Sequence, residues 1–155
     1  MRLDDVMAVI DALEKAEVRY AVFGAMAMAA HGLERATRDL GLFVAVDEDN
    51  IARLRQALGT VFDDPELQEI TADDLAGEYP VIQYGPADAD YTIDIVGRLG
   101  DAFAFDDLEI LTTSVGTSTL RVVSPATLYL MKHDTVRPRD RDDAARLRRA
   151  FDVGE

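Results

Sequence analysis

The strongest constraint on the fold is an apolar run that passes through a single glycine directly into a helix-forming run. Residues 18–23 are rich in β-branched and aromatic side chains and end at Gly24, which predicts a short buried strand. Residues 25–30 have high helix propensity and are stopped by His31-Gly32. A strand, a glycine and a helix in this order bring free backbone N–H groups to one point, where a phosphate can bind. The same arrangement is common in α/β proteins that bind no phosphate there, so alone it predicts only an α/β unit.

The rest of the chain continues to alternate between helical and strand patterns. Apolar residues recur at helical spacing over 3–17, and Ser124 followed by Pro125 is typical of a helix start. The 155 residues have the length of one domain. We therefore predict an α/β fold in a single domain over 1–155, a mixed β-sheet with helices packed against it, that includes the basic helical segment 124–152. Further strands are expected at 39–46, 81–83, 91–96, 108–113 and 119–123, and further helices at 47–58, 125–133 and 140–151.

Composition excludes several classes of function. The chain has no cysteine, which excludes disulfides, zinc–thiolate sites and thiol catalysis. The apolar run from 20 to 30 is too short to span a bilayer, and acidic residues interrupt the N-terminal segment, so we expect a cytoplasmic protein with no membrane partner. A net charge of -14 opposes non-specific binding to nucleic acid.

The charge is distributed unevenly along the chain. Residues 121–150 contain eight basic and four acidic side chains, a local net charge of +4, which leaves -18 on the remainder. This basic C-terminal segment is either an ordinary solvated helix face or a surface for a polyanion, and charge alone does not separate the two.

A motif that carries chemistry starts at Phe23-Gly24-Ala25 and continues after the predicted helix to Asp39-Leu40-Gly41. It resembles the core motif of the DNA polymerase beta nucleotidyltransferase superfamily, in which a glycine and a small residue are followed, after a helix, by Asp-x-Asp or Asp-x-Glu on a strand. The chain looks most like the bacterial AbiEii-type and minimal nucleotidyltransferases, whose pattern is matched in order and spacing by His31-Gly32, Arg35, Thr37 and Asp39.

The resemblance continues downstream. The strand 91–96 carries Asp94 and looks like the strand with the third carboxylate of the superfamily. The stretch from Lys132 through Arg137-Pro138-Arg139-Asp140 to Asp143 resembles the closing segment of the family.

The resemblance implies a nucleoside triphosphate (NTP) as substrate, with Mg²⁺ as cofactor and two ions in an intact site. Carboxylates at i and i+2 of a strand point to one face, and a third on a neighbouring strand completes the oxygen cage that these cations require. The resemblance implies that Asp39 and Asp94 bind metal and that these two residues and Lys132 are catalytic. It also implies that the nucleotide is contacted by Gly24, Ala25, Arg35, Thr37, Arg137 and Arg139.

Structural explanations remain open for the same residues. Asp39 could pair with Arg35 or Arg38, and the charges at 137–140 could be a helix-start cluster. Lys132 could extend outward from an apolar helix face. Asp94 lies between two isoleucines, and a lone buried carboxylate needs a partner or a metal.

The chain departs from the family at Gly41, where the second carboxylate is expected. Glycine within a strand suggests a bulge. Because the lost charge would lie beside both cations, we expect this chain to bind Mg²⁺–NTP weakly and to transfer nucleotide poorly. Glycine occupies little space, so Gly41→Asp should place a carboxylate on the face of Asp39 and restore transfer.

These observations lead to three hypotheses. The first is a nucleotidyltransferase of toxin–antitoxin or defence type, with a cognate antitoxin, that modifies RNA such as tRNA through the basic C-terminal face, or a partner protein. The second, favoured by Gly41, is a catalytically silent module that binds a nucleotide or a partner. The third is an enzyme of the aminoglycoside type, with the acidic segment 63–78 facing a cationic drug.

Overall fold

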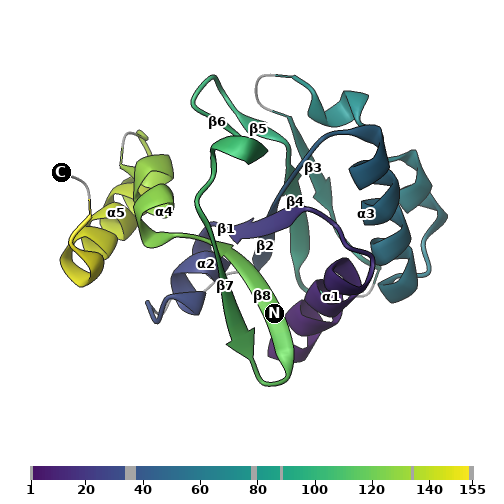
Figure 1. The fold of residues 1–155 in the computed structure, drawn as a ribbon, viewed down its shortest axis with the longest axis horizontal. Helices are drawn as coiled ribbons and strands as arrows, with labels where there is room; N and C mark the ends of the chain where they lie inside the picture. The colour runs from purple at the N-terminus through teal and green to yellow at the C-terminus, as the bar shows by residue number, and fades with distance from the viewer. Residues whose placement is uncertain (1, 34–37, 78–79, 88, 134, 154–155) are drawn as a thin grey trace.

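The computed structural model describes residues 2–33, 38–77, 80–87, 89–133 and 135–153, and it confirms the predicted α/β fold (Figure 1). Six strands form one mixed sheet in the order β3-β4-β2-β1-β8-β7. The strands are β1 (Tyr20–Phe23), β2 (Asp39–Val44), β3 (Val81–Tyr84), β4 (Thr92–Val96), β7 (Ile110–Val115) and β8 (Ser118–Val123). The α-helices are α1 (Leu3–Lys15), α2 (Ala25–Ala30), α3 (Glu48–Val61), α4 (Pro125–Lys132) and α5 (Pro138–Phe151).

The centre of the sheet brings together strands that are far apart in the sequence. Strand β2 pairs antiparallel with β1 and parallel with β4, while β1 continues the sheet through a parallel contact with β8. In this register Gly41 lies between Phe23 of β1 and Asp94 of β4, and Asp94 lies opposite Gln83 of β3. Phe23, Gly41, Asp94 and Gln83 therefore form one row across four strands, and Asp39 lies two residues before Gly41 on β2.

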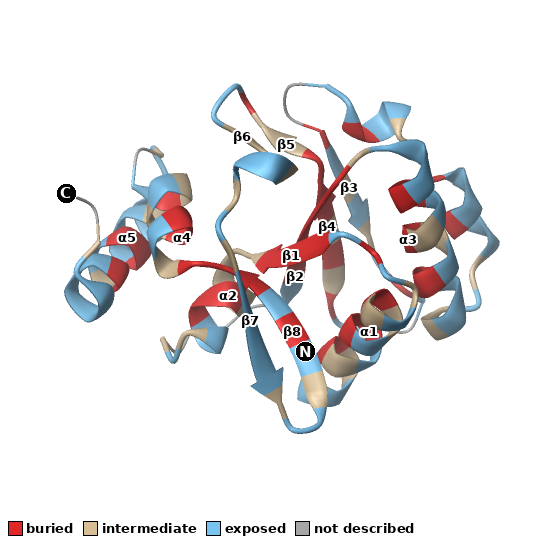
Figure 2. Ribbon diagram, viewed as in Figure 1, coloured by how far each residue is buried: buried red, intermediate tan, exposed pale blue. Residues whose placement is uncertain are grey.

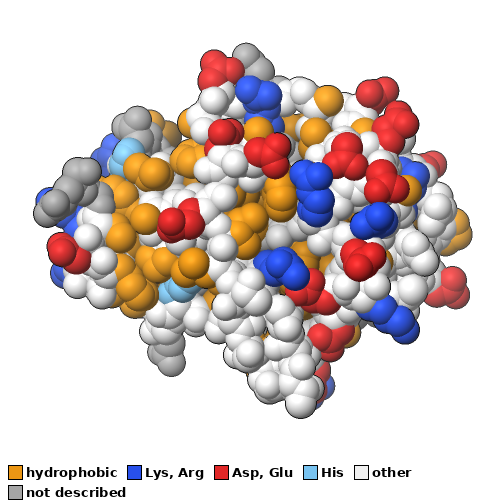
Figure 3. Space-filling view, in the orientation of Figure 1, with side chains coloured by type: hydrophobic (Ala, Val, Ile, Leu, Met, Phe, Trp, Pro, Cys, Tyr) orange, Lys and Arg blue, Asp and Glu red, His pale blue; other side chains and the backbone are white. Residues whose placement is uncertain are grey.

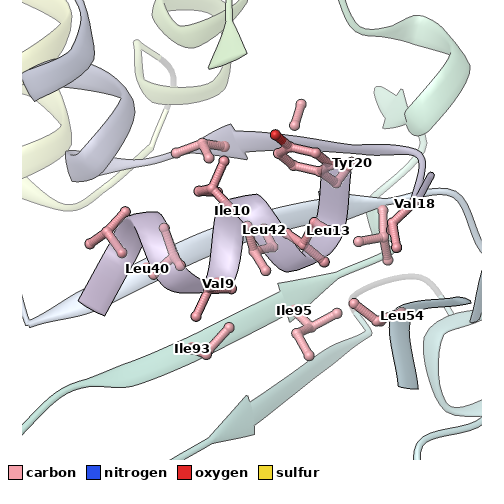
Figure 4. Packing of buried hydrophobic residues seen from close by; sticks show 14 of the residues in the cluster. Val9, Ile10, Leu13, Val18, Tyr20, Leu40, Leu42, Leu54, Ile93 and Ile95 are labelled. Carbon is pink, nitrogen blue, oxygen red and sulfur yellow. The ribbon is translucent and has the colours of Figure 1, made fainter. Parts of the chain in front are cut away.

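One face of the sheet is the hydrophobic core. Alternate side chains of β2 and β4 point to this face, where α1 and α3 cover them (Figures 2 and 4). Leu40, Leu42, Ile93 and Ile95 are fully buried there. The intervening residues, including Asp39, Gly41 and Asp94, must point to the opposite face.

Helix starts follow the chemistry expected from the sequence. Asp47 accepts a hydrogen bond from the backbone N–H of Asn50 at the start of α3, and Ser124 accepts one from Thr127 at the start of α4. Helix α5 begins at Pro138, two residues before the predicted start, because proline is favourable in the first turn. Within the described residues, no helix is both long and apolar enough to cross a membrane.

The structure also contains short elements around the sheet. A two-stranded hairpin, β5 (Arg98–Leu99) and β6 (Phe103–Ala104), follows β4. The acidic segment after α3 contains the 3-10 turns η1 (Pro65–Glu69) and η2 (Asp73–Leu75), and η3 (Phe105–Asp107) precedes β7. Helices α4 and α5 pack on each other at one end of the sheet, away from α1 and α3 (Figure 1).

Candidate active site

A cavity of about 180 Å³ brings together most of the residues that the sequence singled out. It lies on the sheet face opposite the hydrophobic core, between the ends of β1, β2 and β4 and the helices α4 and α5. Arg35 and Thr37, the two remaining predicted nucleotide contacts, lie outside the described residues. The cavity is lined by Phe23, Gly24, Ala25, Asp39, Gly41, Asp94, Lys132, Arg137, Arg139 and Asp140.

The strand register puts both predicted metal ligands on one face. Asp39 lies opposite Thr92 and Gly41 opposite Asp94, so the two carboxylates are offset by two residues on adjacent strands. The Thr92 hydroxyl donates a hydrogen bond to Asp39 Oδ1 at 2.5 Å. The strand pairing on both sides of β2 is regular through Gly41, so the expectation of a bulge at this glycine is wrong.

Asp94 carries the strongest electrostatic signal in the cavity. Its Oδ1 atom is buried and has no hydrogen-bond partner among the described residues. Burial raises the pKa of the Asp94 carboxyl above its ordinary value, the charge of Asp39 raises the same pKa further, and a hydrogen bond from Gln83 acts in the opposite direction. An orphaned carboxylate oxygen beside a second carboxylate is a group that a cation or a proton would stabilise.

The space at Gly41 is smaller than the sequence suggested. A Cβ atom at this position would lie 3.0 Å from Cε1 of the Phe23 ring and 3.0 Å from the Phe23 carbonyl oxygen. An aspartate here would point to the face of Asp39, as predicted, but it would first have to displace the ring. Gly41→Asp can therefore place a carboxylate on this face only if the Phe23 ring and the adjacent backbone shift by a few tenths of an ångström.

Lys132 points inward rather than into solvent. Lys132 is only 7% exposed. Its Nζ atom donates hydrogen bonds to Asp143 Oδ2 at 2.8 Å and to Asp140 Oδ1 at 3.4 Å. The second oxygen of Asp140 accepts a hydrogen bond from the Thr135 hydroxyl at 3.0 Å. These bonds hold the ammonium group at the cavity wall, so the outward orientation that the sequence left open does not occur.

The two predicted arginines lie at the mouth of the cavity. Arg137 is exposed and lies 3.9 Å from Asp140 Oδ2, and Arg139 is exposed in the first turn of α5. The cavity therefore has cationic side chains on one side and the carboxylates of β2 and β4 on the other. Such a cavity suits a ligand that carries phosphate groups.

Gly24 and His31 have structural roles that explain their place in the motif. Gly24 has a φ of 74°, a conformation that favours glycine, where β1 turns into α2. The Nε2 atom of His31 lies 2.7 Å from the Val123 carbonyl oxygen, and the His31 ring packs edge-on against Phe151. His31 thus connects the end of α2 to β8 and α5.

Sequence reasoning did not predict two side-chain contacts at or beside the cavity. Phe23 stands at the start of the motif, but nothing in the local pattern shows that its ring lies against Gly41. Asp143 was noted in the closing segment, but its burial against Lys132 depends on the packing of α5 on α4.

The donor set is small for a metal centre. Within the described ranges, no group of three or more His, Asp or Glu side chains is arranged to hold a metal ion. Asp39 and Asp94 are the carboxylates of the sheet that face the cavity.

Comparison with known proteins places the fold. No family model and no curated protein matches this chain. A crystal structure of an antigenic nucleotidyltransferase-like protein from Paracoccidioides brasiliensis is 15% identical, with a TM-score of 0.56 over 95% of this chain and 77% of that one. ANT(2")-Ia in complex with adenylyl-2"-tobramycin is 13% identical, with a TM-score of 0.54 over 92% of this chain and 84% of that one.

The solution structure of the antibiotic-resistance factor ANT(2'')-Ia gives a similar result. It is 14% identical, with a TM-score of 0.52 over 96% of this chain and 90% of that one. At these identities the likeness concerns the fold, and the chain has the fold of nucleotidyltransferase-like proteins.

Proposed function

We propose that this chain binds an NTP in the cavity and transfers its nucleoside monophosphate to an acceptor, at a rate lowered by the glycine at position 41, where the second carboxylate is expected. The observation that carries the proposal is the convergence of four separate sequence segments, those around residues 24, 39, 94 and 132–140, on one cavity. The nucleotidyltransferase-like fold supports it.

The chemistry assigns a role to each side of the cavity. An acceptor oxygen attacks the α-phosphorus, the bond from this phosphorus to the oxygen bridging to the β-phosphate breaks, and diphosphate leaves while the acceptor oxygen loses a proton. Lys132, Arg137 and Arg139 bind the phosphate oxygens and stabilise the negative charge that develops on the leaving group. Gly24 and Ala25 let the backbone approach the phosphates closely.

Asp39 and Asp94 would hold Mg²⁺ in this proposal. The orphaned Asp94 Oδ1 and the neighbouring Asp39 carboxylate are hard oxygen donors of the kind that the cation prefers. When bound, Mg²⁺ supplies positive charge that offsets the charge of the triphosphate. With glycine at position 41, the donors present suit one ion rather than the two of an intact superfamily site.

RNA, tRNA in particular, is the acceptor that the charge distribution favours. Arg139 lines the cavity, and Arg146, seven residues later, lies on the same side of α5, so positive charge extends from the cavity along the helix. A partner protein is the other acceptor class of the toxin–antitoxin or defence setting that the sequence suggests, with an antitoxin as cognate partner. We place the chain in the cytoplasm, where these acceptors occur.

Two observations bear on the alternatives. The Phe23 ring at the position of the missing carboxylate favours the catalytically silent module. The tobramycin derivative in the ANT(2")-Ia complex favours a small-molecule acceptor. However, the described residues of the acidic segment 63–78 do not line the cavity, which argues against their contact with a drug bound there.

The test is incorporation of labelled NTP into total tRNA, into proteins of a lysate and into tobramycin. We expect slow Mg²⁺-dependent labelling of tRNA, because the second carboxylate is missing, and Asp94→Asn should lower it further by roughly 10²–10³-fold, as for loss of a central electrostatic group. Asp49→Asn on α3 makes the same change of charge on the opposite face of the sheet and should leave labelling unchanged. If protein or tobramycin is labelled instead of tRNA, the labelled molecule is the acceptor and the proposal of RNA is wrong.

Two results would overturn parts of the proposal. If no acceptor is labelled while ATP still binds, the chain is a silent module. In a binding titration, replacement of Arg146, Arg148 and Arg149 by glutamate should weaken tRNA binding strongly. If the affinity for tRNA is unchanged, α5 is not an RNA-binding surface.

A further inference from the structure

A second and larger cavity adjoins the candidate active site. It measures about 400 Å³ and shares a wall with the polar cavity, formed by Phe23, Gly24, Lys132, Arg137 and Asp140. Its remaining walls are mostly apolar and come from β5, α4 and the α4–α5 connection, with Leu99, Leu128, Met131 and Val136. One ligand could therefore occupy a charged and an apolar compartment together.

The outer rim of this apolar cavity is unusually exposed. Val136 is 86% exposed, the largest exposure among the large hydrophobic side chains of the described residues. An exposed valine alone needs no explanation, but this one borders an apolar cavity beside a charged one. Figure 3 shows hydrophobic side chains gathered over the region of α4 and α5. The fold leaves this surface uncovered.

The Phe23 ring stands at the boundary of the two cavities. It lines both of them, and its edge lies so close to Gly41 that a Cβ atom there would come within 3.0 Å of the ring. Phe43, also on this face, supports the ring in an edge-on contact with centroids 6.0 Å apart. The glycine therefore provides the space that the ring occupies, and a larger residue would push the ring toward one of the cavities.

We infer that the apolar cavity binds the nucleobase of the NTP, with the Phe23 ring as part of its wall and with Gly41 as the residue that makes room for that ring. This inference rests on the proposed function, because the phosphates must lie in the polar cavity. A base is planar, largely apolar on its faces and joined to an anionic chain, so it matches the two compartments in chemistry and order. At this position the chain has an aromatic wall where the superfamily pattern has a carboxylate.

The test compares ATP with inorganic tripolyphosphate, which has the phosphate chain but no base. Each is titrated calorimetrically, with Mg²⁺, into the full chain, into Val136→Asn and into Leu130→Asn. Leu130 serves as the control because it is a 51% exposed apolar residue on α4, close in sequence to Val136, and lines neither cavity. Both substitutions are at exposed positions, so neither is expected to unfold the chain.

The inference predicts that ATP binds at least about tenfold more tightly than tripolyphosphate. Val136→Asn should weaken ATP binding several-fold and leave tripolyphosphate binding unchanged. Leu130→Asn should change the binding of neither ligand. Gly41→Ala should act in the same direction by displacing the Phe23 ring. Equal affinities of ATP and tripolyphosphate, or equal effects of Val136→Asn on both, would overturn the inference while leaving phosphate binding intact. If neither ligand binds, the proposed function itself fails.

Discussion

The two faces of the central sheet are built on opposite principles. The face under α1 and α3 is uniformly apolar, and its strand residues, such as Leu42 and Ile95, are fully buried. The opposite face of the same strands carries two carboxylates, a glycine under an aromatic ring and a buried lysine in the adjoining helix. Each apolar residue of the first face lowers the free energy of the fold, whereas Asp94 on the second has a buried oxygen without a described partner.

This difference separates residues that stabilise the fold from residues that the fold must support. An apolar side chain would be accommodated at the position of Asp94 at lower cost in a purely structural sheet. The presence of a carboxylate there, in a cavity that Lys132, Arg137 and Arg139 also line, is the physical reason for placing function on this face.

The largest effect should come from the buried lysine. Lys132→Met leaves Asp143, which is 1% exposed, without its ammonium partner, and we expect a loss of about 3–5 kcal/mol in the free energy of unfolding. The double variant Lys132→Met/Asp143→Asn also removes the charge of the buried carboxylate and should recover part of the loss. Urea denaturation measures all variants; equal losses in the single and double variants would mean that the pair is not coupled.

A somewhat smaller loss is expected on the core face. Leu42→Ala removes a fully buried side chain beneath α1 and should cost about 2–5 kcal/mol. Because it acts through packing, it should not alter ATP affinity under conditions where the chain remains folded. A loss of affinity that exceeds the unfolded fraction would show that the two faces are not independent.

How far the sequence predicts these two faces depends on the range of the interactions. The core face follows from local alternation, since Leu40, Leu42, Ile93 and Ile95 read as one apolar side of two strands. The convergence of Asp39, Asp94 and Lys132 followed only from resemblance to a family motif. Contacts between distant side chains could not be predicted: the Phe23 ring over Gly41 depends on strand register, and the Lys132–Asp143 pair depends on how α5 packs on α4.

The raised pKa of Asp94 should make the stability of the fold depend on pH. Because its pKa is raised above 3.8 in the folded chain, the folded state binds this proton more readily than the unfolded state, and stability falls as pH rises from about 3.8 through the folded pKa. Asp94→Asn cannot ionise, so its stability relative to the native chain should increase over that range and then level off. Denaturation at a series of pH values checks this; a constant difference would place Asp94 in a solvated environment.

The smallest effect on stability is expected on the outer surface of α5. Reversal of Arg148 and Arg149, both exposed, to glutamate should change the free energy of unfolding by about 0.5 kcal/mol or less per residue, with a slight loss because cations favour the C-terminal end of a helix. Thermal denaturation checks this. A large loss would mean that these arginines hold the fold together rather than face a polyanion.

The most direct test of the account is calorimetric titration of ATP into the native chain and into Asp94→Asn and Asp49→Asn, each with Mg²⁺ and with EDTA. We predict one ATP bound per chain, with an affinity that Mg²⁺ increases in the native chain and in Asp49→Asn. In Asp94→Asn the increase with Mg²⁺ should be lost. No ATP binding by the native chain, or the same Mg²⁺ dependence in Asp94→Asn as in the native chain, would contradict the claim that the carboxylate face of the sheet is a nucleotide site.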